Sequence, residues 1–278
     1  MNPLQGILAA AALVLAATSA QAGEEKPLWE VGIGAGAFTF PAYRGSDRNS
    51  NWFLPVPYFT YHGDFFKADR HGIRGSFLDT DRLDFTVSAF LSPPSGSDNA
   101  TARAGMPDLK ATFEIGPQVD VTLWRSENRA RFVKLRLPLR AAFTVEGPPQ
   151  DVGWVFHPNL NFDITDLPGL PGWNLGLVAG PIFGNQRQNA YYYSVAPQYA
   201  TPARPAYEAA SGYTGSQFLV GVSRRFQKFW VGGFASYDNM SGATVADSPL
   251  VQDKNNFAAG IAVSWIFGES STRVMVDD

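Results

Sequence analysis

The feature that most constrains this chain is an alternation of apolar and polar residues over stretches longer than an ordinary strand. From Leu109 to Leu123 the odd-numbered positions are apolar, while the even-numbered positions carry polar residues or glycine. Successive side chains of a β-strand point to opposite faces, so this period of two predicts a long strand with one apolar face. The alternation resumes from Val133 to Val145 after a polar turn at 125–130, which predicts a long hairpin.

Strand length separates a membrane barrel from a soluble β-protein, which composition alone does not exclude. Soluble strands average about five or six residues, whereas a tilted membrane strand needs about nine to eleven. Several alternating stretches reach this length, and the last one places apolar residues at every second position from Phe257 to Phe267. Its aromatic end resembles the C-terminal signal of outer-membrane barrels. We therefore expect the apolar faces to contact lipid and the polar faces to line an enclosed lumen.

The order of strands and connections predicts an up-and-down barrel. After Ala22 no apolar run approaches the roughly 20 residues that a membrane-spanning helix needs. The expected strands cover residues 29–40, 52–62, 65–70, 72–78, 82–91, 109–124, 131–145, 152–164, 173–184, 215–226, 228–238 and 256–267. This predicts an all-β, antiparallel transmembrane barrel of about twelve strands, with both termini in the periplasm and the long loops outside. Because the stretches 65–70 and 72–78 are short, a barrel of about ten strands with an inserted hairpin is the alternative.

The N-terminus has the pattern of a secretory signal peptide. Residues 7–17 form an apolar stretch of suitable length, and Ala20-Gln21-Ala22 matches a small-x-small cleavage site. We expect cleavage between Ala22 and Gly23 and a location in the outer membrane of a Gram-negative cell. The remaining chain then divides into a single barrel domain over 23–267 and a periplasmic tail over 268–278.

Composition and motifs argue against several kinds of chemistry. The chain has no cysteine, and a net charge of −3 provides no basic field for nucleic acid. Its three histidines, at 62, 71 and 157, form no His-Glu-x-x-His pattern, so no zinc site is expected. The Gly-x-Gly-x-Gly run at 32–36 leads to Pro41 rather than a helix, which indicates close backbone approach in a strand rather than a phosphate loop. We expect no cofactor and no enzymatic activity.

The polar face of the long hairpin predicts a charged band inside the lumen. Symmetric closure of the turn at 125–130 predicts cross-strand pairs of Asp120 with Lys134, Gln118 with Arg136 and Glu114 with Arg140. The next hairpin then brings His157 beside Arg140, and Asp163 beside Lys134 or Arg136. The predicted band comprises Glu114, Asp120, Lys134, Arg136, Arg140, His157 and Asp163. It is either the constriction of a narrow channel or an ion-pair network that plugs a small barrel. His157 is also the one candidate general base for an alternative outer-membrane hydrolase.

Aromatic residues give two further expectations. The tryptophans fall near the ends of predicted strands, which predicts girdles at the two membrane interfaces; they are Trp29, Trp52, Trp124, Trp154, Trp173, Trp230 and Trp265. The segment 189–213 is rich in tyrosine and proline and carries little charge. It is too aromatic for a disordered linker, so it either forms a structured cap over the barrel mouth or presents a binding loop.

Several short motifs occur in a recognisable order along the chain. They are Pro41-Ala42-Tyr43-Arg44-Gly45-Ser46, Pro55-Val56-Pro57, Tyr192-Tyr193-Ser194-Val195, Ala206-Tyr207 followed by Gly212, and Ala246-Asp247-Ser248-Pro249-Leu250-Val251. In these motifs the sequence resembles the MltA-interacting protein (MipA)/OmpV family of outer-membrane proteins, from about Trp29 to Phe267. Two features depart from the family pattern: Ser194 replaces a usual glycine, and a tail follows the closing phenylalanine.

The resemblance implies a non-enzymatic barrel that acts as a scaffold in the cell envelope. The implied partners are a murein-cleaving lytic transglycosylase and a murein-synthesising penicillin-binding protein, with outer-membrane lipid around the wall. A narrow small-solute channel and a surface adhesin are the alternatives. No residue pattern in the chain itself indicates a role with murein.

Overall fold

The computed structural model describes residues 24–63, 66–69, 72–75, 78–80, 82–97 and 101–276. The predicted signal peptide, with its cleavage site between Ala22 and Gly23, lies outside the described residues, and so does His71. Among the described residues no helix is long and apolar enough to cross a membrane.

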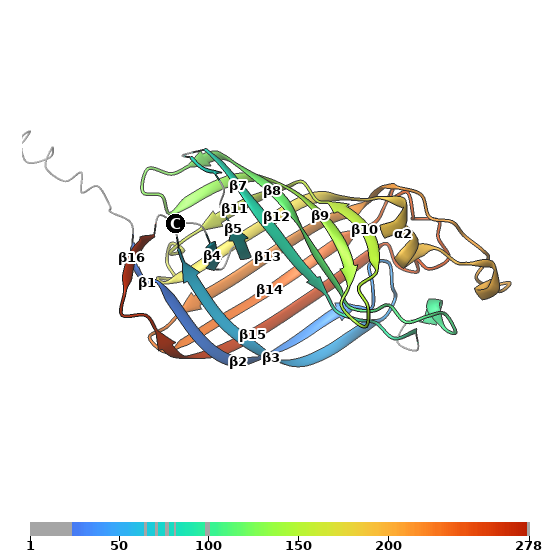
Figure 1. The fold of residues 1–278 in the computed structure, drawn as a ribbon, viewed down its shortest axis with the longest axis horizontal. Coiled ribbons are helices and arrows are strands. Elements are labelled where there is room, and N and C mark those ends of the chain that lie inside the picture. Colours follow the sequence, from blue (N-terminus) through green and yellow to red (C-terminus); the bar gives the residue numbers. More distant parts are fainter. Residues whose placement is uncertain are drawn as a thin grey trace, which may run out of the picture.

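Antiparallel strands form one large sheet that curves into a barrel, as Figure 1 shows. The strands are β2 (Trp29–Pro41), β3 (Asn49–His62), β4 (Phe66–Asp69), β5 (Gly72–Gly75), β6 (Leu78–Asp79), β7 (Leu83–Ser92), β8 (Thr112–Arg125), β9 (Arg131–Thr144), β10 (Asp151–Phe156), β11 (Asn159–Ile164), β12 (Trp173–Gly184), β13 (Gly212–Arg225), β14 (Phe229–Asn239) and β15 (Asn255–Glu269). Neighbours in sequence pair with each other, and β15 pairs with β2. At the other seam β5 lies beside β7.

The prediction of an up-and-down barrel of about twelve strands is confirmed. Strands β10 and β11 share one position in the wall, because both pair with β9 and β12 on either side of Pro158. A proline has no amide hydrogen to donate, so the ladder is interrupted there. Strand β5 and the first residue of β6 fall in the stretch predicted as one strand, 72–78. Strand β5 pairs with β4, and β6 pairs with β7. The short third and fourth strands are therefore part of the wall.

The two faces of the wall differ as the alternation predicts. In β15 the side chains of Phe257, Ile261 and Trp265 are 63%, 69% and 51% exposed on the outside. Their neighbours Ala262 and Ser264 are buried on the inside. An outer wall of exposed apolar side chains is what contact with lipid requires and what a soluble fold avoids.

Glycines of β2 allow the close backbone approach that the sequence predicts. A Cβ added at Gly32 would overlap the carbonyl oxygen of Trp265, and one at Gly34 would overlap that of Val263. Any side chain at these two positions would therefore collide with β15. This strand pairs with β2 and so joins the C-terminal part of the sheet to the N-terminal hairpin.

The prediction that all tryptophans belong to interfacial girdles is wrong for Trp230. Its ring lies inside the barrel, 6.1 Å from the ring of Tyr58 on β3. Trp52 also lies on the inward-facing parity of its strand, opposite Phe38 of β2. A position near a strand end sets the height of a side chain in the membrane, but only strand parity sets the face it occupies.

The two chain ends meet in a separate ribbon. Strand β1 (Glu24–Pro27) pairs antiparallel with β16 (Arg273–Val276), and Figure 1 shows this ribbon at the end of the barrel opposite α2 (Gln186–Tyr193). The amide of Leu28 donates to the carbonyl of Thr272 at 2.9 Å, which continues the pairing toward β2. Strand β15 runs to Glu269, beyond the predicted closing residue Phe267.

The outward and inward faces should respond differently to an added charge. We expect Ile261→Lys, on the outer face of β15, to lower the free energy of unfolding in lipid vesicles by about 2–4 kcal/mol, because the ammonium group then lies in hydrocarbon. Gln118→Lys is the inward-facing control, since its ammonium can still donate to Asp120, and we expect a change below about 1 kcal/mol. Urea unfolding followed by tryptophan fluorescence measures both, and equal losses would contradict the assignment of faces.

Candidate functional site

The residues of the predicted charged band lie on the inward face of neighbouring strands. Arg140 Nε donates to Glu114 Oε2 at 2.9 Å, and Arg140 Nη1 donates to Ser88 Oγ at 3.3 Å. Arg136 Nε lies 4.0 Å from Asp120 Oδ2, and Gln118 Nε2 donates to Asp120 Oδ1 at 2.7 Å. The band therefore contains at least two ion pairs, each extended by a neutral hydrogen-bonding side chain.

The predicted pairing within this band is wrong in register. Asp120 is opposite Arg136 rather than Lys134, which is opposite Thr122. The turn closes further along the chain than predicted, with Arg125 opposite Phe132, and the bulge between Thr122 and Trp124, which places an extra residue in β8, then changes the register by one residue. Arg140 still reaches Glu114 diagonally across the hairpin. The directly opposed residues on the inward face are Gln118 with Pro138, Glu114 with Ala142, Asn159 with Arg136, Asn161 with Lys134, and Asp163 with Phe132.

His157 lies at the junction of β10 and β11 and is 9% exposed. Its amide donates to the carbonyl of Pro138 at 3.3 Å, and its Nε2 atom has no hydrogen-bond partner among the described residues. Within the same described part of the chain, no group of three or more His, Asp or Glu is placed to hold a metal ion. Among the described residues, no nucleophile is hydrogen-bonded to the Nε2 atom of His157.

A cavity of about 370 Å³ lies in the lumen beside the charged band. Aromatic side chains of β2 and β14 form one part of its wall, namely Phe38, Trp230 and Phe234. Side chains of β9 and β11 form the polar part, namely Arg136, Asn161 and Asp163. Its lining begins near the end of the barrel that carries the terminal ribbon, because Asn174 and Trp230 are each the second residue of their strand, and it extends along the lumen to Phe38, near the other end of β2.

The opposite end of the barrel is covered by a cap with its own hydrophobic core. The buried side chains of this core are Tyr43, Met106, Leu109, Tyr193, Val195, Ala209, Met240, Ala243, Val245 and Leu250. They come from four connections between strands and from α2, so the structured-cap interpretation of 189–213 is confirmed. The cap also contacts the lumen, because Arg44 Nε lies 3.9 Å from Asp238 Oδ1 on β14.

Four of the five motifs that carry the family resemblance meet in this cap, whereas Pro55-Val56-Pro57 lies within wall strand β3. The hydroxyl of Tyr43 donates to the carbonyl of Leu250 at 2.6 Å, and that of Ser248 donates to the carbonyl of Tyr193 at 2.7 Å. Burial raises the pKa of Tyr43 to about 12, which keeps its phenol protonated as a donor at neutral pH. These motifs therefore hold the loops together.

Two arginines of the cap act as staples between loops, and the sequence analysis did not identify them. Arg204 donates through Nη1 to the carbonyls of Ala102 and Ala104, both at 2.9 Å, and through Nη2 to Tyr199 O at 2.7 Å. Arg103 donates to the carbonyl of Tyr192 at 3.0 Å. The short 3-10 helices η2 (Thr101–Arg103) and η3 (Pro197–Tyr199) are joined in this way. The available signal was Arg204, the one charged residue between positions 188 and 207.

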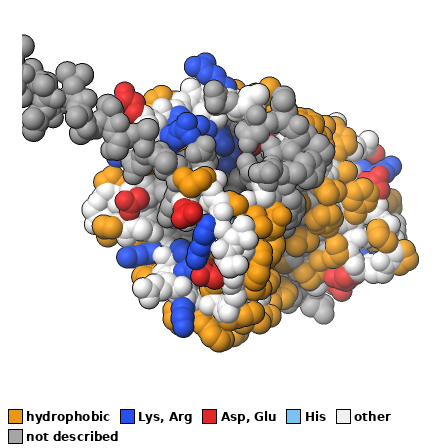
Figure 2. Space-filling view, turned by 60° about the vertical axis from the view of Figure 1, so that its left-hand side comes forward, with side chains coloured by type: hydrophobic (Ala, Val, Ile, Leu, Met, Phe, Trp, Pro, Cys, Tyr) orange, Lys and Arg blue, Asp and Glu red, His pale blue; other side chains and the backbone are white. Residues whose placement is uncertain are grey.

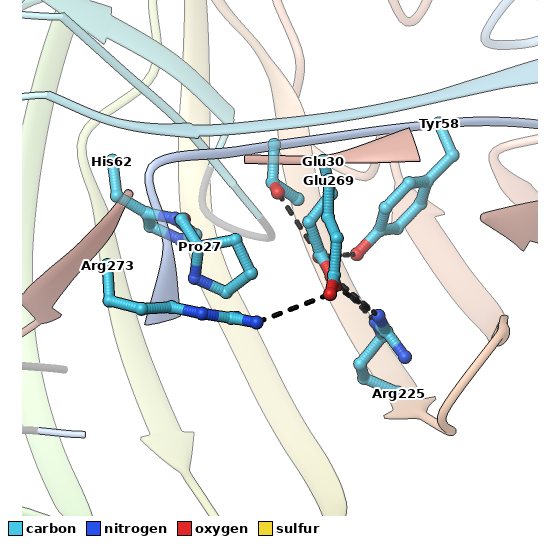
Figure 3. Close-up of polar contacts among 8 residues, drawn as sticks. Pro27, Glu30, Tyr58, His62, Arg225, Glu269 and Arg273 are labelled. Atoms are coloured by element: carbon cyan, nitrogen blue, oxygen red, sulfur yellow. Dashed lines mark hydrogen bonds and ion pairs between the residues drawn. The ribbon is translucent and has the colours of Figure 1, made fainter. Parts of the chain in front are cut away.

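A network of charged groups lies at the other end of the barrel, as Figure 3 shows. We call it the mouth network, and its members are Glu30, Tyr58, Thr60, Arg225, Glu269 and Arg273. Glu30 is 6% exposed and accepts from Arg225 Nη2 at 2.6 Å and from the hydroxyl of Tyr58 at 2.9 Å. Glu269 lies 3.9 Å from Arg225 and 3.2 Å from Arg273, which belongs to β16.

The mouth network ties the terminal ribbon to the barrel wall. His62 Nδ1 lies 2.9 Å from the carbonyl oxygen of Pro27 and adds a contact between β3 and β1. Figure 2 shows Lys, Arg, Asp and Glu side chains gathered on this end of the molecule, whereas hydrophobic side chains extend along the wall. This end therefore presents a polar, structured surface outside the apolar wall.

Comparison with known proteins gives consistent results. The sequence profile described as "MltA-interacting protein MipA" matches residues 33–267. Outer membrane protein OmpV of Vibrio cholerae serotype O1 is 23% identical over 215 residues, with 75% of this chain and 76% of the relative covered. Outer membrane protein Omp26La of Vibrio anguillarum is 24% identical over 215 residues, with the same 75% and 76% coverage. The NanC porin structure has a TM-score of 0.40 at 9% identity and covers 84% of this chain and 98% of its own.

The staple role of Arg204 can be tested by proteolysis of the cap. Arg204→Ala leaves three backbone carbonyls without their charged donor, and we expect chymotrypsin to cut near Tyr199 about tenfold faster. Arg187→Ala, which removes only an exposed ion pair with Asp151, is the matched control and should leave the rate unchanged. Equal cleavage rates in Arg204→Ala and the unmodified protein would contradict the staple.

Proposed function

The chain belongs to the MltA-interacting protein (MipA) family and is an outer-membrane protein, and from this premise we propose that it is a non-enzymatic interaction protein of the cell envelope. In this proposal its apolar wall contacts outer-membrane lipid. Its periplasmic end binds a lytic transglycosylase of the kind that the family name denotes and brings it near a penicillin-binding protein.

The terminal ribbon is the observation that carries this proposal. The turns expected on the periplasmic side are short and offer little surface for a partner. The ribbon, which is formed by the two described ends of the chain, projects from one end of the barrel (Figure 1). Among the described residues β16 pairs with β1 alone, so its outer edge carries backbone groups that an extended segment of a partner can pair with.

The ribbon is also held in a defined orientation. Arg273 Nη2 donates to Glu269 Oε1 at 3.2 Å, and the amide of Ser270 donates to the carbonyl of Trp29 at 2.9 Å. A preordered edge strand costs a partner less conformational entropy than a flexible tail would. Met275 is 59% exposed on this strand and gives the edge an apolar contact point.

Site-specific photocrosslinking in intact cells tests the scaffold proposal. We expect a photoreactive aromatic residue at Met275 to form an adduct with a lytic transglycosylase, identified by mass spectrometry, because that position is exposed on the ribbon. The same residue at Ala206, which is exposed on the cap at the opposite end, should form none. If Met275 yields no adduct with a murein enzyme while the variant is correctly inserted, the proposal fails.

A narrow solute channel is the second candidate function, and the lumen cavity favours it. The cap covers one end of the barrel and ion pairs occupy the lumen at Arg136 and Arg140, so we expect the purified protein to carry no steady current in planar bilayers. Reproducible conductance steps from the unmodified protein would contradict a closed barrel and support the channel.

A further inference from the structure

The cavity in the lumen has the features of a small-molecule site, which the scaffold proposal does not use. We propose that it binds an uncharged molecule that combines an aromatic ring with a hydrogen-bond donor. Its volume of about 370 Å³ lies within the range of ligand sites, and its lining comes from opposite sides of the barrel, from β2 and β3 to β9 and β11.

The aromatic part of the wall is shaped to present ring faces. A Cβ added at Gly232 would overlap the ring of Trp230, and one at Gly260 would overlap the ring of Phe38. The two rings therefore lie directly against glycine positions of the wall. Phe38 and Phe234 are stacked with ring centroids 6.5 Å apart. A second planar ring can stack on such a surface, which adds to the stabilisation from apolar burial.

The polar part of the wall supplies an unused acceptor. Asn161 is 2% exposed, and its Nδ2 donates to the carbonyl of Leu177 at 3.3 Å. Its Oδ1, in contrast, is a buried atom with no hydrogen-bond partner among the described residues, and Asn161 is one of the residues that line the cavity. A buried acceptor without a partner is costly, so a ligand that donates an N–H or O–H to it regains that free energy.

The charges around the cavity favour a neutral ligand. Arg136 and Asp163 both line it, and their formal charges are opposite in sign. An ionic ligand would have to leave water for a space with no excess opposite charge, which is unfavourable.

The ligand reaches this cavity from the end that carries the mouth network. Asn174, Ser223 and Trp230 line the cavity close to the ends of their strands on that side. The cap core lies at the other end of the barrel. A periplasmic solute therefore has the shorter path, past Tyr58, whose ring lies 6.1 Å from that of Trp230.

Indole is a suitable probe because it combines an aromatic ring with one N–H donor. We expect the full-length protein in nanodiscs to bind indole saturably in equilibrium dialysis, after subtraction of protein-free nanodiscs. Asn161→Leu removes the acceptor at similar volume and should weaken binding about tenfold. 1-Methylindole, which has no donor, should bind more weakly than indole and show no difference between Asn161→Leu and the unmodified protein.

Tryptophan variants test the stacking surface separately. Trp230→Leu should weaken indole binding about tenfold, Trp230→Phe should retain most of it, and Trp265→Leu on the outer wall should leave it unchanged. Indole binding that does not saturate, or that is the same in Asn161→Leu as in the unmodified protein, overturns the proposal. So does an equal loss in Trp230→Leu and Trp265→Leu. The assay contains no partner protein, so its failure is distinct from failure of the scaffold proposal.

Discussion

Backbone amide and carbonyl groups in the hydrocarbon of a membrane have no water to bond with, so each needs a partner within the protein. A sheet meets this requirement only when it closes, and here closure requires β15 to pair along β2. The same constraint fixes the side chains, because each strand must present apolar residues outward and leaves only alternate positions for the lumen. The charged band and the polar side chains of the cavity are built from those alternate positions.

The two ends of the barrel are not bound by this requirement for apolar residues on the outside, and their structures differ from each other. At one end the loops bury Leu250 and Tyr193 in a core of their own, held by hydrogen bonds from Tyr43 and Ser248 to backbone carbonyls. At the other end, charged groups around Glu30 hold the ribbon of the two chain ends. All the family motifs except Pro55-Val56-Pro57 lie in the first of these structures, whereas the surface that we assign to a partner lies outside the matched residues 33–267.

The sequence predicts the wall well because a period of two is a local signal that repeats along each strand. From Thr112 to Leu123 apolar and polar residues alternate without a break, so each residue supports the same strand and the same assignment of faces. Register is harder to predict, since the bulge at Thr122 and Trp124 depends on how the turn closes. The ribbon is harder still, because its strands have only 4 residues each and are joined across the whole chain. Likewise, the contact of Glu30 with Arg225 depends on which strands become neighbours around the mouth, and no local pattern encodes it.

The mouth network connects the ribbon to the cavity through consecutive contacts. Arg273 pairs with Glu269, Arg225 contacts both Glu269 and Glu30, Glu30 accepts from Tyr58, and Tyr58 packs beside Trp230 at the cavity wall. Contiguous contacts transmit an effect only if some member has two stable arrangements. Arg225 is the member that lies near two carboxylates, 2.6 Å from that of Glu30 and 3.9 Å from that of Glu269. If a partner draws Glu269 away with the ribbon, Arg225 keeps only Glu30, and the hold on Tyr58 beside the cavity changes with it. Arg225, which contacts both Glu30 and Glu269, is therefore the residue that connects the ribbon to the wall of the cavity.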